Sequence, residues 1–135
     1  MKKKIYYGHH LYKYNTPIED FELSIIREKL SDYEIFNPST QFIFSPHMTE
    51  DEIMLECLEK VKECDALVFS SLSGVVGRGV YLEVLQALNT GKEVYYLKQD
   101  KLIRIKYIKF KDVEEKFKSN RTFKVIKNFG ILEVI

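Results

Sequence analysis

The chain has 135 residues, of which 45% are hydrophobic and 30% are charged, and its formal net charge is +1. This length fits one domain with a single core, and a charge so near zero argues against a protein built mainly to coat nucleic acid or an anionic membrane. No apolar run approaches the roughly 20 residues that span a bilayer, and residues 1–8 do not resemble a secretory signal. The two cysteines, Cys57 and Cys64, match neither a close zinc pair nor a disulfide framework. We therefore expect a cytoplasmic globular domain that is not attached to a membrane.

The first part of the chain reads as a strand followed by a helix. Lys3–Gly8 is short, aromatic and β-branched, which predicts a strand, and a loop follows it. Thr16, a proline and Glu19 form the start signal of a helix that extends to about Leu30. Four residues at helical spacing are its expected apolar face: Ile18, Phe21, Ile25 and Ile26.

A second strand, helix and strand follow. Tyr33–Phe36 is a short strand that Asn37-Pro38 ends, and residues 39–47 are an aromatic loop. Thr49 with Glu52 forms a capping box, which opens a helix to about residue 63. Asp65–Ser70 is a continuous apolar run, as expected of a strand buried on both faces of a parallel sheet.

The next segments complete the pattern. Ser71–Gly79 reads as a glycine-containing loop, a helix begins at Val80, and Gly91 ends it as a left-handed cap. Lys92–Leu97 is a fourth strand. Strands alternating with helices predict a single-domain α/β fold over residues 1–135. We expect it to be flavodoxin-like or Rossmann-like and doubly wound, with a mainly parallel sheet and helices on both faces.

Residues 98–135 read as a less regular extension of the same domain. Leu102–Phe110 indicates one or two strands, Asp112–Lys118 a short helix, and Thr122–Ile126 another strand. The hydrophobic ending Phe129–Ile135 is typical of a buried terminus or a subunit contact.

Charge is unevenly distributed along the chain. Residues 19–65 hold 13 acids and 4 bases, a net charge of −9, whereas residues 98–127 hold 11 bases and 4 acids, a net charge of +7. The two segments could neutralise each other within one fold or across a subunit contact, or the basic one could face phosphate. Because the basic segment contains no recognition helix or stacking motif, we do not expect a nucleic-acid partner.

Ligands of open parallel sheets bind beyond the carboxyl ends of the strands. Gly8 with His9, Asn37, and the loop Ser71–Gly79 all reach that edge. In the loop, three glycines precede a helix whose amides and dipole could receive an anion, although a plain surface turn explains them equally well. The loop matches neither a Walker A motif nor a dinucleotide fingerprint. Adjacent histidines at positions 9 and 10 chelate poorly, so we expect no metal and no other cofactor.

Glu83 is the main catalytic candidate. It lies in the first turns of the helix that follows the glycine loop, and with Val80 and Val84 facing the sheet it would project sideways near the strand ends. A desolvated carboxylate held by tyrosines there suits a nucleophile or general base. The alternative is an ordinary acid that favours the N-terminal end of a helix.

Three segments resemble the nucleoside 2-deoxyribosyltransferases and the related deoxynucleoside 5′-monophosphate N-glycosidases. They are Lys4-Ile-Tyr6-Tyr-Gly8, Asp65-Ala-Leu-Val-Phe69 and Gly79-Val-Tyr-Leu-Glu83-Val-Leu-Gln-Ala87-Leu-Asn-Thr-Gly91-Lys92. In that superfamily a Gly-x-x-x-Glu-x-x-x-Ala-x-x-x-Gly-Lys segment carries the nucleophile, and this chain reproduces its spacing in full. The resemblance covers roughly residues 4–97.

The resemblance implies a role for each matching residue. Glu83 would attack C1′ of a (deoxy)ribosyl group, and Tyr6 would orient Glu83 through its hydroxyl. The loop Ser71–Gly79 would line the sugar or a 5′-phosphate, with Ser71, Ser73 and Arg78 as phosphate contacts beside Gly77 and Gly79. From their place at the strand ends, Gly8 and His9 could contact a base or phosphate and Asn37 a ribose hydroxyl, although Asn37 could equally well form a turn. Domains of this kind commonly pair so that a neighbour completes the site, so we expect a homodimer or larger assembly.

The chain also departs from the superfamily pattern. Gly77 stands where the transferases have an acid and the monophosphate hydrolases a serine, and Tyr81 replaces a glycine, which would narrow the approach to Glu83. The acid that protonates the leaving base has no clear match; Cys57 stands at about its position.

We therefore expect an N-glycosidase or N-(deoxy)ribosyltransferase that acts on a nucleoside, a nucleotide or an NAD-like compound. The NAD-like class is included because nicotinamide leaves easily and needs no general acid. The alternative is a non-catalytic module that binds a nucleotide or a nucleotide-derived signal on the same fold.

Overall fold

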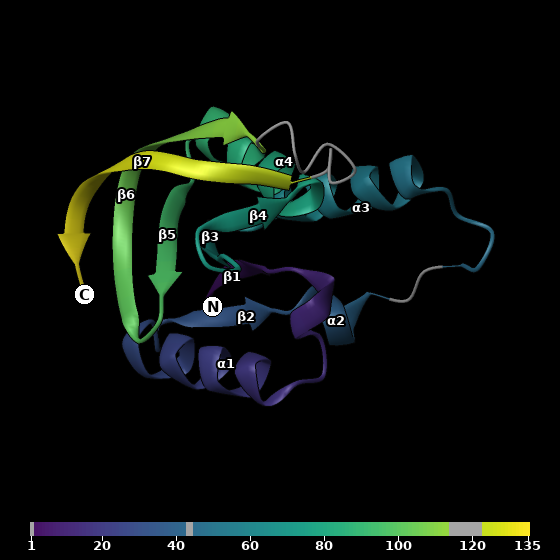
Figure 1. Ribbon diagram of the computed structural model, residues 1–135. Helices are drawn as coiled ribbons and strands as arrows, with labels where there is room; N and C mark the ends of the chain where they lie inside the picture. The colour runs from purple at the N-terminus through teal and green to yellow at the C-terminus, as the bar shows by residue number, and fades with distance from the viewer. Residues whose placement is uncertain (1, 43–44, 114–122) are drawn as a thin grey trace.

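The computed structural model describes residues 2–42, 45–113 and 123–135 (Figure 1). In the first half of the chain the elements are β1 (Lys3–Gly8), the 3-10 helix η1 (Leu11–Lys13), α1 (Pro17–Lys29), β2 (Tyr33–Phe36), α2 (Pro38–Gln41) and α3 (Glu50–Glu63). In the second half they are β3 (Ala66–Ser70), β4 (Val75–Gly77), α4 (Arg78–Asn89), β5 (Glu93–Lys98), β6 (Lys101–Asp112) and β7 (Phe123–Val134).

The strands form one seven-stranded sheet in the order β2-β1-β3-β5-β6-β7-β4. The first four are parallel, and β6, β7 and β4 add antiparallel pairings. The predicted α/β fold is confirmed, with a sheet that is mixed because the C-terminal third contributes a hairpin. The strand order reverses between β1 and β3, which is where ligands of such sheets bind.

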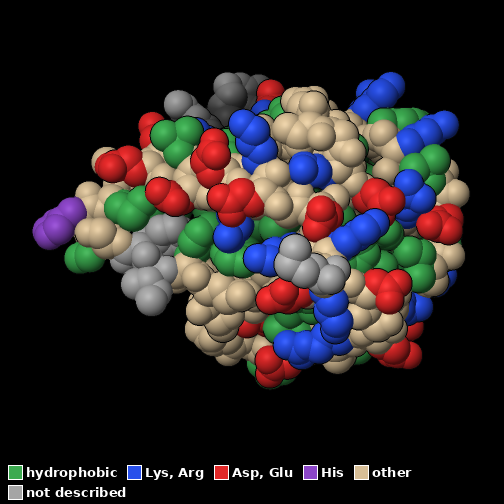
Figure 2. All heavy atoms as spheres, turned by 180° about the vertical axis from the view of Figure 1, so that it is seen from behind, with side chains coloured by type: hydrophobic (Ala, Val, Ile, Leu, Met, Phe, Trp, Pro, Cys, Tyr) green, Lys and Arg blue, Asp and Glu red, His purple; other side chains and the backbone are tan. Residues whose placement is uncertain are grey.

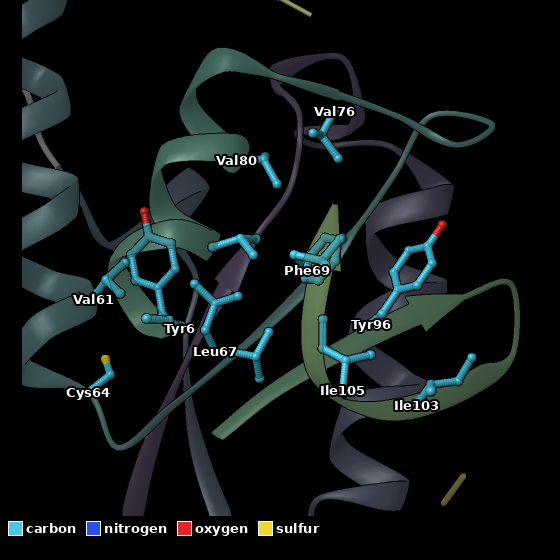
Figure 3. Packing of buried hydrophobic residues seen from close by; sticks show 14 residues of the cluster. Tyr6, Val61, Cys64, Leu67, Phe69, Val76, Val80, Tyr96, Ile103 and Ile105 are labelled. Atoms are coloured by element: carbon cyan, nitrogen blue, oxygen red, sulfur yellow. The ribbon is translucent and has the colours of Figure 1, made fainter. Parts of the chain in front are cut away.

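Two hydrophobic layers cover the two faces of the sheet. Residues of α1 pack on one face, and residues of α3 and α4 pack on the other. Because side chains alternate along a strand, β1 sends Tyr6 into the α3/α4 layer and Tyr7 into the α1 layer, and both are fully buried. Figure 3 shows the Tyr6 ring packed near Val61, with its hydroxyl pointing out of the apolar cluster.

Helix α1 buries a different face from the one that periodicity predicts. Ile26 is buried as expected, but Ile18 is 55% and Phe21 49% exposed, so the prediction for these two is wrong. Glu19 and Glu22 take their places in the interior. The helix is turned so that two carboxylates face the strand ends, where a histidine and a lysine of the preceding loop meet them.

The caps that the sequence predicts are present, with one difference. Thr49 and Glu52 form the full capping box of α3, and Gly91 follows α4 with a φ of +73°. At α1, Thr16 accepts a hydrogen bond from the Glu19 amide, but the Glu19 carboxylate does not return to Thr16 and accepts from the Asn15 amide.

Two segments expected to be loops contain regular structure. Residues 39–47 overlap α2. The segment Ser71–Gly79 contains β4, which pairs with the first residues of β7, and α4 begins at Arg78 rather than at Val80. The extra strand arises because β7 folds back over the sheet and offers β4 a free edge.

The C-terminal third is a long β-hairpin that curls over the sheet (Figure 1). Leu102–Phe110 lies in one strand, β6. Of the predicted strand Thr122–Ile126, residues 123–126 form the start of the longer β7, and Thr122 lies outside the described residues. Of the predicted helix Asp112–Lys118, Asp112 is the last residue of β6, and residues 114–118 lie outside the described part of the chain.

The hydrophobic ending is not buried within the chain. Ile131, Leu132 and Val134 are 53%, 52% and 60% exposed, so the buried-terminus prediction is wrong, and the subunit contact stays a prediction.

No ion pair between described residues joins the acidic segment 19–65 to the basic segment 98–127. Figure 2 shows acidic and basic side chains intermingled over one face of the molecule. No helix in the described ranges is long and apolar enough to cross a membrane.

The orientation of α1, with Ile18 exposed and Ile26 buried, predicts unequal effects of substitution on stability. Replacing Ile18 with Ala should change the free energy of unfolding by no more than about 0.5 kcal/mol, since the side chain is mostly in solvent. Replacing Ile26 with Ala on the same helix should cost about 2–5 kcal/mol, because it opens a cavity. Urea denaturation of both variants measures the difference, and equal costs would contradict this orientation of α1.

Candidate active site

Glu83 lies on the buried stripe of α4, with Val80, Val84 and Ala87. Its side chain does not project sideways as expected but is turned inward, and the residue is only 6% exposed. The Tyr6 hydroxyl donates a hydrogen bond to Glu83 Oε2. Gly8, at the end of β1, leaves room for the carboxylate, since a Cβ there would lie 3.3 Å from Glu83 Oε1. The structure thus brings Glu83, Tyr6 and Gly8 together beside the reversal of strand order.

Burial controls the ionisation of this pair. It raises the pKa of Glu83 to about 8, although the hydrogen bond from Tyr6 opposes the shift. Burial also raises the pKa of Tyr6, and the charge of Glu83 raises it further, so the phenol stays protonated as the donor. Among the ion pairs of the described residues, none involves Glu83. A cationic group of a ligand would therefore find an uncompensated carboxyl group here.

Two further side chains surround the pair. Cys57, on α3, interacts with the Tyr6 hydroxyl; burial and then the charge of Glu83 raise the pKa of its thiol to about 11. Tyr14 comes from the loop between β1 and α1; burial and then the charge of Glu83 raise the pKa of its phenol. Among the described residues, the titratable groups whose pKa values the charge of Glu83 raises are therefore two phenols, Tyr6 and Tyr14, and one thiol, Cys57.

On the opposite face of the sheet, a second glutamate meets the neighbouring tyrosine. Tyr7 donates to Glu22 Oε1 at 2.5 Å, and Ser70 donates to the same oxygen at 2.7 Å. Lys13 completes the cluster, with its Nζ 2.9 Å from Glu22 Oε2. Glu22 therefore has an internal cation, and Glu83 has none among the described residues.

His9 is buried with both ring nitrogens occupied. Its Nδ1 lies 3.0 Å from the carbonyl oxygen of Tyr7, and its Nε2 lies 2.6 Å from Glu19 Oε2. A carbonyl oxygen only accepts, so Nδ1 is the donor, and a second proton must lie between Nε2 and Glu19. The ring also stacks on Tyr7, with the centroids 3.7 Å apart. In this conformation His9 braces the loop and offers no nitrogen to a substrate.

The other predicted substrate-binding residues are spread around the same edge. Asn37 caps α2, accepting from the Ser39 amide at 3.0 Å, and lines a hollow of about 450 Å³ together with Glu19. Ser71 and Ser73 line a second hollow, of about 410 Å³, between the end of β5 and β7.

The start of α4 holds the last three predicted residues. Gly77 is its N-cap, and the His10 ring packs there so closely that a Cβ on Gly77 would lie 2.9 Å from it. Arg78 is half exposed, with its guanidinium 3.5 Å from Asp51. Gly79 lies in the first turn, beside α3.

The ring contacts of Tyr81 are made with the C-terminal hairpin. Tyr81 packs edge-on against Phe110 of β6, with the centroids 5.0 Å apart, and the Lys124 ammonium lies over its ring. The residue expected to narrow the approach to Glu83 instead anchors the C-terminal hairpin on α4.

Sequence reasoning missed Lys13, Glu22 and Tyr14. Lys13 is the last residue of η1 and follows two strongly exposed residues, so nothing local marks it as buried. Glu22 could have been found, because it shares the helical stripe of Leu23 and Ile26. In the described part of the chain, no group of three or more His, Cys, Asp or Glu side chains is placed to hold a metal ion.

Comparison of the sequence with protein-family models and with curated proteins found no match. Solved structures do match. One is a conserved protein from Enterococcus faecalis V583, with a TM-score of 0.60 and 20% identity over 71% of this chain and 63% of that chain, which is less than two thirds of its length. Another is the Clostridium botulinum CMP N-glycosidase BcmB, with a TM-score of 0.47 and 20% identity over 70% of each chain. At this identity the likeness shows the fold alone.

The two tyrosines of β1 give a matched pair of variants. Tyr6→Phe removes the hydrogen bond that stabilises the Glu83 carboxylate, so the midpoint of Glu83 titration should rise from about 8 by about one pH unit. Tyr7→Phe acts on the opposite face and should leave that midpoint unchanged. Carbon-13 NMR titration of the carboxyl groups, with Glu83→Gln to assign the signal, measures both. An equal response to the two variants would show that Tyr6 is not the donor.

The raised pKa also predicts how stability depends on pH. The folded protein binds the Glu83 proton more tightly than the unfolded chain does, so this residue costs stability as the pH rises from about 4.5 to about 8. Glu83→Gln should thus be nearly neutral at pH 4 and stabilising by on the order of 5 kcal/mol at pH 9. Urea denaturation at both pH values tests this. Glu93→Gln is the control: hydrogen bonds from Tyr95, then Tyr33, lower the pKa of Glu93, so its effect has the opposite sign.

Proposed function

We propose that this protein is an N-glycosidase or base-exchange enzyme that cleaves the bond between base and sugar in a nucleoside, a nucleotide or an NAD-like compound, with Glu83 as nucleophile. One observation carries the proposal. A buried carboxyl group is held by a phenol at the ligand-binding edge of the sheet, and no ion pair among the described residues compensates it. Sugar cleavage of this kind develops positive charge at C1′, which such a carboxylate stabilises.

The reaction proceeds in two displacements. A Glu83 oxygen forms a bond to C1′ while the C1′–N bond breaks, and the electron pair of that bond leaves with the base. The product is a glycosyl ester of Glu83. Water then attacks C1′ and gives up one proton to the solvent, the ester bond breaks, and the carboxylate is restored; in exchange, a second base attacks C1′ in place of water. Tyr6 donates to one carboxylate oxygen throughout and leaves the other, beside Gly8, for attack.

The surroundings of Glu83 bear on the leaving group. A neutral base leaves with an extra electron pair and must gain a proton, but the titratable groups found around Glu83 are phenols and a thiol with raised pKa values. These are weak acids at neutral pH. A cationic base such as nicotinamide leaves as a neutral molecule and needs no proton. NAD-like compounds therefore belong in the first substrate panel.

The direct test is release of free base from deoxynucleosides, nucleoside and deoxynucleoside monophosphates, and NAD, followed by chromatography. The native protein should release base from at least one compound, and Glu83→Gln should be slower by roughly 10³-fold or more. Because the nucleophile must be ionised, kcat/KM should rise about tenfold per pH unit up to about pH 8 and then level off. Tyr33→Phe is the control, since it removes a phenol that donates to Glu93, away from Glu83.

A second function is favoured by the same pKa. At neutral pH most of Glu83 is the protonated acid, which can donate a hydrogen bond to a ligand without attacking it. A non-catalytic module that binds a nucleotide would use the site in this way. It would show a nucleotide-dependent rise in melting temperature that survives Glu83→Gln, with no base released from any compound.

A further inference from the structure

Lys13 is buried although its neighbours in the chain are not. It is 4% exposed, whereas Leu11 and Tyr12 in the same turn are 69% and 76% exposed. A lysine is almost never buried this fully unless it is paired. Its burial therefore calls for a specific set of partners.

All three ammonium protons of Lys13 have acceptors. Nζ lies 2.9 Å from Glu22 Oε2, 2.8 Å from Ser70 Oγ and 2.9 Å from the carbonyl oxygen of Ser71. Glu22 belongs to α1, Ser70 is the last residue of β3, and Ser71 follows it. One side chain therefore joins three segments: the loop after β1, helix α1 and the end of β3.

The loop that Lys13 anchors borders the Glu83 site. It starts at Gly8, beside the Glu83 carboxylate, and its His10 ring packs on Gly77, the N-cap of the helix that carries Glu83. The His10 ring also stacks with Phe123 of β7, with the centroids 5.3 Å apart. Tyr14, next to Lys13 in the chain, packs against the His9 ring of the same loop, with the centroids 4.8 Å apart, and burial and then the charge of Glu83 raise the pKa of its phenol.

We propose that Lys13 is a positioning residue: by crossing from the loop to the end of β3, it holds His10 against the start of the helix that carries Glu83. This rests on the proposed function for its catalytic consequence, but the tether itself is a property of the fold. Without it, binding a substrate has to order the loop. The conformational entropy lost in ordering the loop then weakens substrate binding, so KM rises more than kcat falls.

The test needs a variant that does not leave a buried charge unpaired. Lys13→Met alone strands the Glu22 carboxylate. Lys13→Met combined with Glu22→Gln removes both charges, and the amide oxygen introduced by the second change can still accept from Tyr7 and Ser70. Ser70→Ala is the second variant, because it removes one acceptor of Lys13 and keeps the ion pair. Lys60→Met, which breaks an exposed pair with Glu63 on α3, is the matched control.

The main measurement is amide hydrogen exchange of residues 10–16, which needs no substrate. Loss of hydrogen bonds to a charged group should speed exchange there by roughly tenfold or more in the double variant, less in Ser70→Ala, and not at all in Lys60→Met. If the double variant is folded and the amides of residues 10–16 exchange as slowly as they do in the native protein, the proposal is overturned.

The kinetic measurement separates the two proposals. If the native protein releases a base, the double variant should raise KM several-fold with a smaller change in kcat, and an unchanged KM would overturn the positioning role. If no compound yields a base, the proposed function fails, and hydrogen exchange alone decides whether Lys13 tethers the loop.

Discussion

The site depends on the hydrogen bonds that two neighbouring tyrosines of β1 donate to two buried glutamates on opposite faces of the sheet. Tyr6 meets Glu83, and Tyr7 meets Glu22. Because side chains alternate along a strand, the two buried phenols point to opposite faces of the sheet. Each carboxyl group is taken out of water beside the reversal of strand order, so each imposes a desolvation cost that the surrounding residues must offset.

The two faces offset that cost differently. On the α1 face a lysine neutralises Glu22, a serine donates to it, and a histidine shares a proton with Glu19. The donors and acceptors of that cluster are used within the protein, which makes it a brace. On the α4 face Glu83 has a phenol but no cation among the described residues, and burial moves its pKa to about 8. The uncompensated group is the one that a ligand can complete.

The sequence predicted the elements whose signals are local. The capping box of α3, the left-handed Gly91 and the apolar run of β3 each specify an element through neighbouring residues, and the structure contains all three. The burial of Lys13 and the pairing of β4 with β7 depend on partners about 50 residues away, so no local pattern announces them. Glu83 was singled out by its place in the helix after the glycine loop, but periodicity gave no reason to prefer it over an ordinary helix acid, and its role and that of Tyr6 came from the resemblance.

The buried face of α1 points to a sequence signal for the ligand-binding edge: an acid among the apolar residues near the start of a helix. Glu22 and Glu83 are each the sixth residue of their helix, and each shares the stripe of buried apolar residues. In a β-α-β unit the helix runs antiparallel to the strands, so its first turns lie at the carboxyl ends of the strands, where loop side chains can supply hydrogen bonds. An acid on the apolar stripe of those first turns is therefore placed at the ligand-binding edge. Whether it forms a brace or a site depends on what lies against the carboxylate: a lysine in the loop before α1 satisfies Glu22, and the glycine that ends β1 leaves Glu83 open.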